Sequence, residues 1–71
     1  MKFKIMGKKG DAVMEYDDVE IQEIKFNELV EANYLPIALK QLGKDLEKNT
    51  LMKAFDPDVD EVLFMPRVVG G

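Results

Sequence analysis

The chain has 71 residues, of which 46% are hydrophobic and 34% are charged, and its formal net charge is −4. A chain of this length forms one small domain with a thin core. It contains no cysteine and no histidine, which excludes disulfides, thiolate sites, nucleophilic thiols and histidine as a general base or metal ligand. We therefore expect no catalytic residue, no bound metal and no bound cofactor.

The acidic balance also argues against nucleic acid as a partner, since nucleic-acid-binding domains cluster Lys and Arg. The N-terminal segment Met1–Met6 alternates apolar residues with lysines and lacks the long apolar core of a signal peptide. No run of residues approaches the length of a membrane span. The expectation is a cytoplasmic protein with no membrane partner.

The first sixteen residues predict a β-hairpin. Residues 2–6 alternate polar and apolar side chains, which is the period of a strand. Residues 7–11, Gly-Lys-Lys-Gly-Asp, supply a turn whose glycines are available for positive φ. Ala12–Tyr16 then predicts a second strand, in which Val13 lies across from the first.

The middle of the chain begins with an ambiguous segment. Asp17-Asp18 ends the strand pattern. Within the segment 19–26 that follows, Val19–Ile21 fits a short strand, and Ile21–Ile24 fits the opening of a helix equally well. Asn27 is predicted to be a helix N-cap. In that case Glu28 and Glu31 lie near the positive end of the helix dipole, where acidic side chains are favourable.

Pro36 is expected to divide this helical middle. A proline lacks an N–H and cannot simply continue a helix, but it is favourable in the first turn of a new one. Beyond Pro36, apolar residues recur at helical spacing, at Ile37, Leu39, Leu42 and Leu46. Gly43 either ends this second helix or weakens it, and Asn49 closes it.

The last third of the chain returns to strands. Leu51–Phe55 suggests a short strand, Asp56–Asp58 a turn, and residues 59–69 the last strand. Strands that flank one helical block, without alternating with helices, indicate an α+β domain with a helical middle packed on one face of the sheet.

The last strand is predicted to be central in the sheet. Val62 and Phe64 are apolar on one side of it, and Leu63 and Met65 are apolar on the other. A strand with two apolar sides belongs in the interior of a sheet. Pro66 marks the expected end of pairing, because proline cannot donate a hydrogen bond to a neighbouring strand.

The last four residues are Val68-Val69-Gly70-Gly71. Glycine has no side chain and takes almost any backbone conformation, so a two-glycine tail can thread a narrow cleft and present its carboxylate to an activating enzyme. With Gly at about 7% of residues, a Gly-Gly end arises by chance in roughly 0.5% of chains. The prediction is one domain over residues 1–67 and a flexible tail over residues 68–71.

The opening hairpin and the closing segment resemble the ubiquitin-like β-grasp superfamily. Its members begin with a hairpin, pack a central helix on a mixed sheet and end in a central strand that runs into Gly-Gly. The segment Asp60-Glu61-Val62, the proline after the apolar run and Val69-Gly70-Gly71 are similar to the bacterial sulfur carriers, the small subunit of molybdopterin synthase and the thiamine sulfur carrier. Arg67 stands where ubiquitin keeps one of its tail arginines. Ubiquitin-like folds usually have one uninterrupted helix followed by two further strands.

The resemblance implies a protein that is activated by a partner and supplies no catalysis itself. An adenylating enzyme would activate the Gly71 carboxylate with ATP. The acyl group would then pass to sulfur, giving a thiocarboxylate, or to an enzyme cysteine, from which a target lysine forms an amide. Gly70 and Gly71 would be the reactive tail, and Arg67, Val68 and Val69 would dock in the enzyme, although a solvated charge and ordinary strand residues explain them equally well. A conjugating enzyme or a deconjugating protease would be further partners.

Three classes of function stay open. The first is a ubiquitin-like protein modifier, with sulfur carriage through a C-terminal thiocarboxylate as its variant. The second is a small acidic binding or inhibitor module, which suits a basic partner surface. The third is a double-glycine secretion leader, against which Pro66 and the strand-rich C-terminal run argue.

Acidic residues near the last strand have the spacing of a calcium loop only in part. Asp56, Asp58 and Asp60 occupy the first three ligand positions, but Glu61 replaces the required glycine and Arg67 replaces the bidentate glutamate. We therefore predict a turn with solvated carboxylates, and we give Asp60 and Glu61 no acid–base role.

Overall fold

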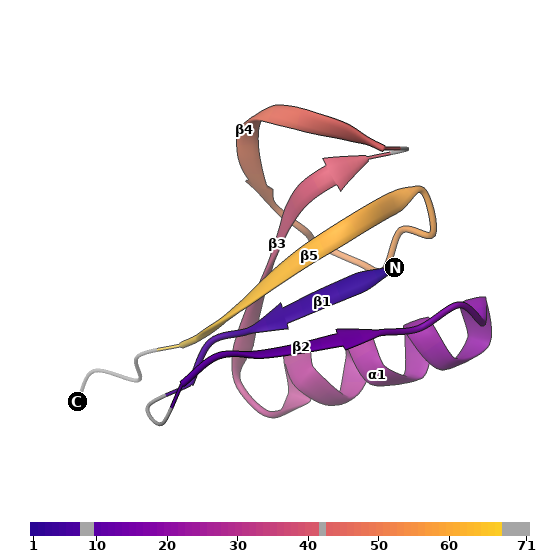
Figure 1. Cartoon of the computed structure of the whole chain (residues 1–71). Helices are drawn as coiled ribbons and strands as arrows, with labels where there is room; N and C mark the ends of the chain where they lie inside the picture. The colour runs from indigo at the N-terminus through magenta and orange to yellow at the C-terminus, as the bar shows by residue number, and fades with distance from the viewer. Residues whose placement is uncertain (8–9, 42, 68–71) are drawn as a thin grey trace.

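A computed structural model describes residues 1–7, 10–41 and 43–67, with the backbone alone described for residues 45–49. Its elements are β1 (Lys2–Ile5), β2 (Ala12–Glu15), α1 (Val19–Glu31), β3 (Tyr34–Gln41), β4 (Lys44–Leu51) and β5 (Val59–Pro66). The strands form one mixed sheet in the order β2-β1-β5-β3-β4, and α1 lies on one face of it (Figure 1). The α+β prediction is confirmed, and the arrangement is compatible with a β-grasp-like fold.

The N-terminal hairpin forms as the sequence predicts. β1 and β2 pair antiparallel, with Lys4 opposite Val13. The Tyr16 N–H donates to the Met1 carbonyl oxygen at 3.0 Å, which extends the hairpin one residue beyond β2. Gly10 has a φ of 125°, a backbone conformation that side-chain-bearing residues rarely adopt. The turn residues Lys8 and Lys9 lie outside the described residues.

The helix begins earlier than predicted, so the assignment of Asn27 as N-cap is wrong. Asp18 is the cap, and its Oδ1 accepts hydrogen bonds from the backbone N–H groups of Glu20 at 2.8 Å and Ile21 at 3.4 Å. The reason is the spacing of the residues that α1 turns toward the sheet: Gln22, Phe26 and Leu29. These positions form one helical stripe that starts well before Asn27. The ambiguous segment 19–26 is therefore helical.

The predicted second helix is wrong, because residues 34–51 form the β3–β4 hairpin. Leu35, Ile37 and Leu39 alternate at the strand period, whereas Ile37, Leu39, Leu42 and Leu46 suggested a helix, so periodicity alone does not decide. Pairing decides, since β3 lies between β4 and β5 and hydrogen-bonds to both. Gly43, with a φ of 78°, lies in the hairpin turn. Leu42 lies outside the described residues, and the side chain of Leu46 is not described.

Pro36 sits inside β3 without interrupting the sheet. Its carbonyl oxygen accepts a hydrogen bond from the Met52 N–H at 2.8 Å, so it points toward the β4 side. The N–H and C=O groups of one residue in an antiparallel strand point to the same side. The missing N–H of Pro36 therefore faces the side on which β4 has already ended at Leu51, and pairing with β5 is unaffected.

The strand predicted over Leu51–Phe55 is also wrong, because β4 ends at Leu51. Residues 52–58 instead cross back to β5, and Met52 and Phe55 pack against the core on the way. The turn predicted at Asp56–Asp58 is confirmed: the Asp58 N–H donates to Asp56 Oδ1 at 2.9 Å, and the Val59 N–H donates to the Asp56 carbonyl oxygen at 3.1 Å.

The core lies between α1 and the sheet. Of the described residues, its fully buried apolar members are Phe3, Phe26, Ala38, Val59, Val62 and Phe64. The rings of Phe3 and Phe26 both pack edge-on against Phe64, with centroid distances of 4.9 and 5.8 Å. Aromatic side chains therefore supply most of a small core, as expected for a chain of this length.

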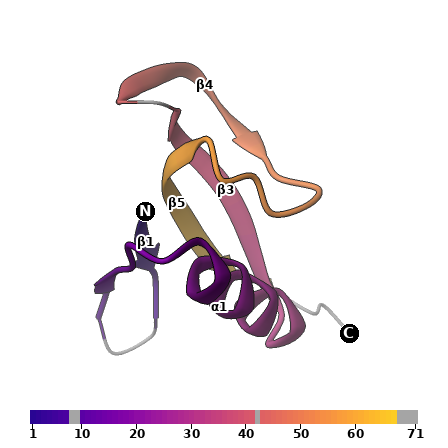
Figure 2. The same cartoon turned by 90° about the vertical axis from the view of Figure 1, so that its right-hand side faces the viewer.

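β5 is central in the sheet, as predicted, but only one of its faces is fully covered. Val62 and Phe64 are completely buried beneath α1, whereas Leu63 is half-buried and Met65 is 38% exposed. Figure 2 shows the reason: α1 lies against one face of the sheet, and β4 lies far from the helix. The predicted strand 59–69 is shorter than expected and ends at Pro66.

Candidate functional site

The C-terminal end of β5 is where the described chain approaches the predicted reactive tail. β5 pairs parallel with β1 on one side and antiparallel with β3 on the other. The β1 pairing ends at Ile5 opposite Phe64, and the β3 pairing continues to Tyr34 opposite Pro66. Pro66 thus ends the sheet pairing of β5, as its lack of an N–H predicts.

One residue beyond β5, the backbone is still held in place. The Arg67 N–H donates to the Asn33 carbonyl oxygen at 2.8 Å. Asn33 has a φ of 70°, the left-handed conformation that asparagine tolerates better than most residues. It directly follows Ala32, the C-cap of α1. The end of the helix and the end of the central strand are therefore tied together at one point.

The predicted site residues are only partly described. Arg67 is exposed, which is compatible with a docking side chain and equally with a solvated charge. Val68, Val69, Gly70 and Gly71 lie outside the described residues, so their predicted roles stay predictions.

A groove of about 440 Å³ lies beside Arg67. It is bounded by the second half of α1, the first residues of β3 and the segment after β4. Apolar and aromatic side chains supply much of its lining, including Phe26, Tyr34 and Phe55, and Arg67 and Lys53 add positive charge. The sequence did not indicate this groove, because the first residues of β3 and the segment 51–55 meet α1 only in the folded chain.

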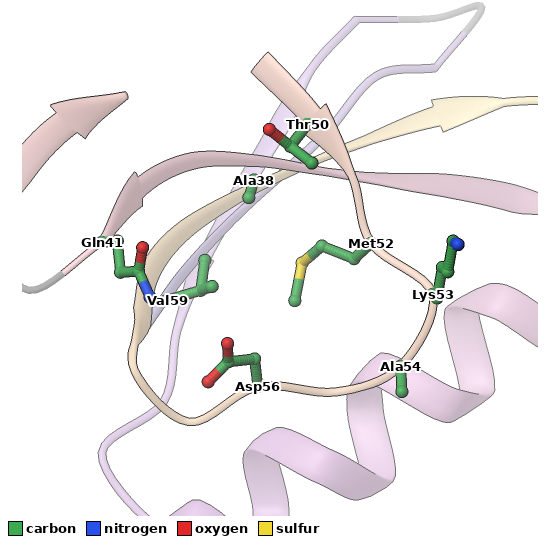
Figure 3. A pocket seen from close by; sticks show the side chains of 8 residues that line it. All are labelled: Ala38, Gln41, Thr50, Met52, Lys53, Ala54, Asp56 and Val59. Carbon is green, nitrogen blue, oxygen red and sulfur yellow. The ribbon is translucent and has the colours of Figure 1, made fainter. Parts of the chain in front are cut away.

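A smaller cavity of about 260 Å³ lies under the segment that joins β4 to β5. Figure 3 shows the Met52 side chain pointing into it, with Ala38, Thr50 and Val59 around it and Asp56 and Lys53 toward its rim. Its volume is below the roughly 300–1,000 Å³ typical of small-molecule sites. We read it as a loosely packed extension of the core, in which the flexible thioether of Met52 fills an irregular space.

A charged cluster spans the three middle strands on the sheet face opposite α1. Glu61 of β5 is only 8% exposed, and its Oε1 lies 2.6 Å from Lys4 Nζ of β1. Its Oε2 lies 3.9 Å from Lys40 Nζ of β3. The hydrogen bond from Lys4 and the positive charges of Lys4, Lys40 and Lys2 hold the pKa of Glu61 below its usual value, although burial acts in the opposite direction.

The structure makes Glu61 a largely buried partner of two lysines. Sequence reasoning missed the cluster because Lys4, Lys40 and Glu61 are far apart in the chain. Only the order of the strands brings them together.

The carboxylate of Asp56 shapes a turn, because its Oδ1 accepts a hydrogen bond from the Asp58 N–H. Among the residues whose side chains the structure describes, the acidic ones form no group of three suited to a metal ion. In the same part of the chain, α1 is too short and too polar to cross a membrane.

No protein-family model, curated protein or solved structure matches this chain. A functional assignment therefore depends on the topology and on the residues themselves.

Proposed function

We propose that this chain is a ubiquitin-like protein modifier, activated at the Gly71 carboxylate by an ATP-dependent adenylating enzyme and then joined to amines of target proteins. In this proposal Gly71 is the mature carboxyl terminus, either as encoded or after processing. The observation that carries the proposal is the position of β5: a central strand, paired on both sides, leads to Arg67 four residues before Gly71.

The topology supports the β-grasp assignment on which the proposal depends. The N-terminal hairpin is followed by one uninterrupted helix over Val19–Glu31 and then by two strands, β3 and β4. This is the pattern that ubiquitin-like folds usually have. The sequence pattern had indicated a divided helix and one short strand, so the folded chain resembles the superfamily more closely than its sequence did.

A tail that follows a central strand suits a protein that is itself a substrate. An activating enzyme must hold the tail extended in a cleft, so the strand that leads to the tail needs a fixed position. Here β5 is fixed by its pairing with β1 and β3 and by the hydrogen bond from the Arg67 N–H to the Asn33 carbonyl oxygen. Arg67 also offers an exposed positive charge to the enzyme.

The chemistry of the proposal balances without any catalytic group on this chain. A Gly71 carboxylate oxygen attacks the α-phosphorus of ATP, forms the acyl-adenylate and releases pyrophosphate. An enzyme thiolate then attacks the acyl carbon and releases AMP, giving a thioester. A target lysine amine attacks the thioester, forms an amide, releases the thiolate and gives up one proton.

The experiment compares two tagged chains in the source cell: the full chain and a deletion of Gly70 and Gly71, each with an N-terminal tag. Both are purified under denaturing conditions and analysed on gels. Higher-mass species that appear with the full chain and disappear with the deletion support the proposal. A single unmodified species in both samples contradicts protein modification.

Intact mass then separates the other candidates. An oxygen-for-sulfur mass change at the carboxyl terminus would favour sulfur carriage, which the similarity of Asp60-Glu61-Val62 and Val69-Gly70-Gly71 to the sulfur carriers makes the second candidate. An unchanged intact mass of the full chain would favour the acidic binding module, provided that the variant without Gly70 and Gly71 keeps the full biological activity of the chain.

A further inference from the structure

The strand β3 extends beyond the end of its neighbour β4. β3 begins at Tyr34, whereas β4 ends at Leu51, which lies opposite Ile37. A hydrogen bond from the Met52 N–H to the Pro36 carbonyl oxygen follows this pair. The first residues of β3 therefore have β5 on one side and, within the part of the chain that the structure describes, no strand on the other (Figure 2).

At this free edge of β3, the backbone N–H and C=O groups of Tyr34 point away from β5. The Pro36 carbonyl oxygen points toward the β4 side, and the direction of the backbone polar groups repeats every second residue along a strand. The Asn33 carbonyl oxygen, which accepts from the Arg67 N–H, points toward β5, as this alternation requires. On the β4 side, no described residue hydrogen-bonds to the Tyr34 N–H or C=O. Unpaired groups on a strand edge are a template for pairing with another extended chain.

The groove of about 440 Å³ lies beside this free edge, because Tyr34 and Pro36 are among the residues that line it. One wall is a stripe of α1 that includes Phe26 and Val30. The other wall includes Phe55, whose ring centroid lies 5.7 Å from that of Phe26. Val30 is 41% exposed, so part of the apolar lining is open to a partner. A groove of this size admits a large apolar side chain such as that of Phe or Leu.

The charged side chains of the groove are Glu23, Lys53 and Arg67, which together carry one net positive charge. The two cations lie near the free edge. The Arg67 N–H bonds to Asn33, one residue before the edge, and Lys53 directly follows Met52, whose N–H bonds to β3 at the other end of the edge. Glu23 lies in the first half of α1, whereas the free edge adjoins the end of this helix.

The acidic residues around the groove leave both cations available. Glu28 is paired with Lys25 at 3.4 Å, and Asp56 Oδ1 accepts a hydrogen bond from the Asp58 N–H. Glu31, the last residue of α1, does not line the groove. Both cations are exposed, and no described residue forms an ion pair with either side chain.

We infer that this edge and groove bind an extended segment of a partner protein, in which a large apolar residue lies two positions from an acidic residue. The segment adds to β3 as a short strand and forms two hydrogen bonds with Tyr34, one with its N–H and one with its C=O. The residue opposite Tyr34 shares its face of the sheet, and Tyr34 packs against the core on the side of α1. The apolar side chain of the segment therefore enters the groove.

The occupant is a peptide segment because the open groups at the groove are a backbone donor and a backbone acceptor on a strand edge, which an extended chain matches. Side chains two positions apart in such a chain lie on the same face. The acidic residue therefore also faces the groove, where it complements Lys53 and Arg67. The inference does not depend on the proposed function, because neither Gly70 nor Gly71 takes part.

The probe is a phage-displayed library of random heptapeptides, selected on the full chain. The selected peptides should share a large apolar residue two positions from an acidic residue. A synthetic copy at saturation should slow hydrogen exchange of the Tyr34 amide by about tenfold or more, because a peptide carbonyl oxygen then accepts from it. A library that yields no binder, or a bound peptide that leaves this exchange rate unchanged, overturns the inference.

Two matched variants locate the binding. V30E and I24E each replace an exposed apolar residue of α1 with the same acidic residue, but only Val30 lines the groove. The affinity of the selected peptide should fall by about tenfold or more in V30E and should stay within about twofold in I24E. Equal affinities for the two variants place the peptide elsewhere and overturn the inference. Circular dichroism checks that both variants are folded.

A second pair of variants tests the charge. K53E should weaken binding of the acidic peptide several-fold, whereas K44E, which makes the same change at an exposed lysine outside the groove, should not. Replacing the acidic residue of the peptide with lysine should restore part of the affinity for K53E. An equal effect of K53E and K44E means that only the net charge of the chain matters, and it contradicts the inferred contact.

N-methylation of the peptide tests strand addition directly. Only every second amide of an added strand faces β3, so N-methyl groups should abolish binding at alternate positions and should be tolerated between them. Tolerance at every position overturns the inference. The peptide should bind equally well to the chain without Gly70 and Gly71, which keeps this test separate from that of the proposed function. Binding only after this deletion also overturns the inference, since the chain's own tail then fills the groove.

Discussion

The backbone N–H of Arg67 donates a hydrogen bond to the carbonyl oxygen of Asn33 at 2.8 Å. This bond joins the turn that ends α1 to the residue that follows the central strand. The left-handed conformation of Asn33, with a φ of 70°, places its carbonyl group there. One residue thus ends the helix and holds the base of the predicted tail.

Replacing Asn33 should reveal the importance of this conformation. The Asn33 side chain is exposed, so N33A removes little packing. We expect N33A to lower the free energy of unfolding by roughly 1 kcal/mol, because alanine is strained at positive φ. N33G should cost less, since glycine adopts this conformation freely. Urea denaturation measures both, and equal losses for the two variants would refute the backbone explanation.

The position of the helix cap leads to a second prediction. D18A removes the side-chain acceptor that serves the N–H groups of Glu20 and Ile21. Its free energy of unfolding should fall by about 1 kcal/mol. N27A, at an exposed position inside the helix, is the matched control and should leave the free energy of unfolding unchanged or raise it by up to about 0.7 kcal/mol, because alanine has the higher helix propensity. The reverse order of effects would mean that the helix begins at Asn27 after all.

The Glu61 cluster predicts a dependence of stability on pH. The pKa of Glu61 is lower in the folded chain than its ordinary value of 4.5. The unfolded chain therefore binds a proton at Glu61 at a higher pH than the folded chain does. The stabilisation is complete above the unfolded-state pKa and is lost as the pH falls through the folded-state pKa.

The variant E61Q isolates this contribution. Its free energy of unfolding should differ most from that of the wild type at neutral pH, and the difference should narrow as the pH falls below 4.5. E15Q serves as a control, because Glu15 lies on the exposed edge strand β2 of the same sheet. A gap between wild type and E61Q that stays constant with pH would show that Glu61 contributes through packing and not through its charge.

Replacing Arg67 distinguishes a role of this side chain in docking from a role in folding. Its side chain is exposed, so R67A should leave the free energy of unfolding within about 0.5 kcal/mol of the wild type. If Arg67 docks in the activating enzyme, R67A should reduce the yield of conjugates several-fold, and R67K should restore part of it because the charge is retained. Gel densitometry of purified conjugates measures this. Equal yields for all three chains would leave Arg67 as a solvated charge.

The sequence was sufficient for the parts of the fold in which local pattern and pairing agree. Alternation and turn residues predicted the hairpin of β1 and β2 and the turn at Asp56–Asp58, and apolar side chains on both sides of β5 predicted its central position. Residues 34–51 were not predicted correctly, because Ile37, Leu39, Leu42 and Leu46 suggest a helix, and pairing of β3 with β5 overrides that pattern. Gly43 was expected to end or to weaken a helix, although a glycine also fits the turn of the β3–β4 hairpin, where it lies.

The candidate site was also predictable from the sequence only in part. The proposed role of Gly70 and Gly71 comes from composition and resemblance alone. The hydrogen bond between Arg67 and Asn33 and the trio of Lys4, Lys40 and Glu61 depend on strand order, and strand order cannot be deduced from local spacing. The difference in burial between Val62 and Phe64 on one side of β5 and Leu63 and Met65 on the other required knowing which side of the sheet α1 covers (Figures 1 and 2).

The most direct test of the central claim is a search for a chemical remnant on target lysines. Trypsin cleaves after Arg67, so a conjugated lysine should retain the four residues Val-Val-Gly-Gly on its side-chain nitrogen. Mass spectrometry of trypsin-digested protein from the source cell should detect such peptides when the full chain is expressed, and none when Gly70 and Gly71 are deleted. The absence of this remnant from cells that express the full chain in quantity would contradict the claim that the chain modifies other proteins.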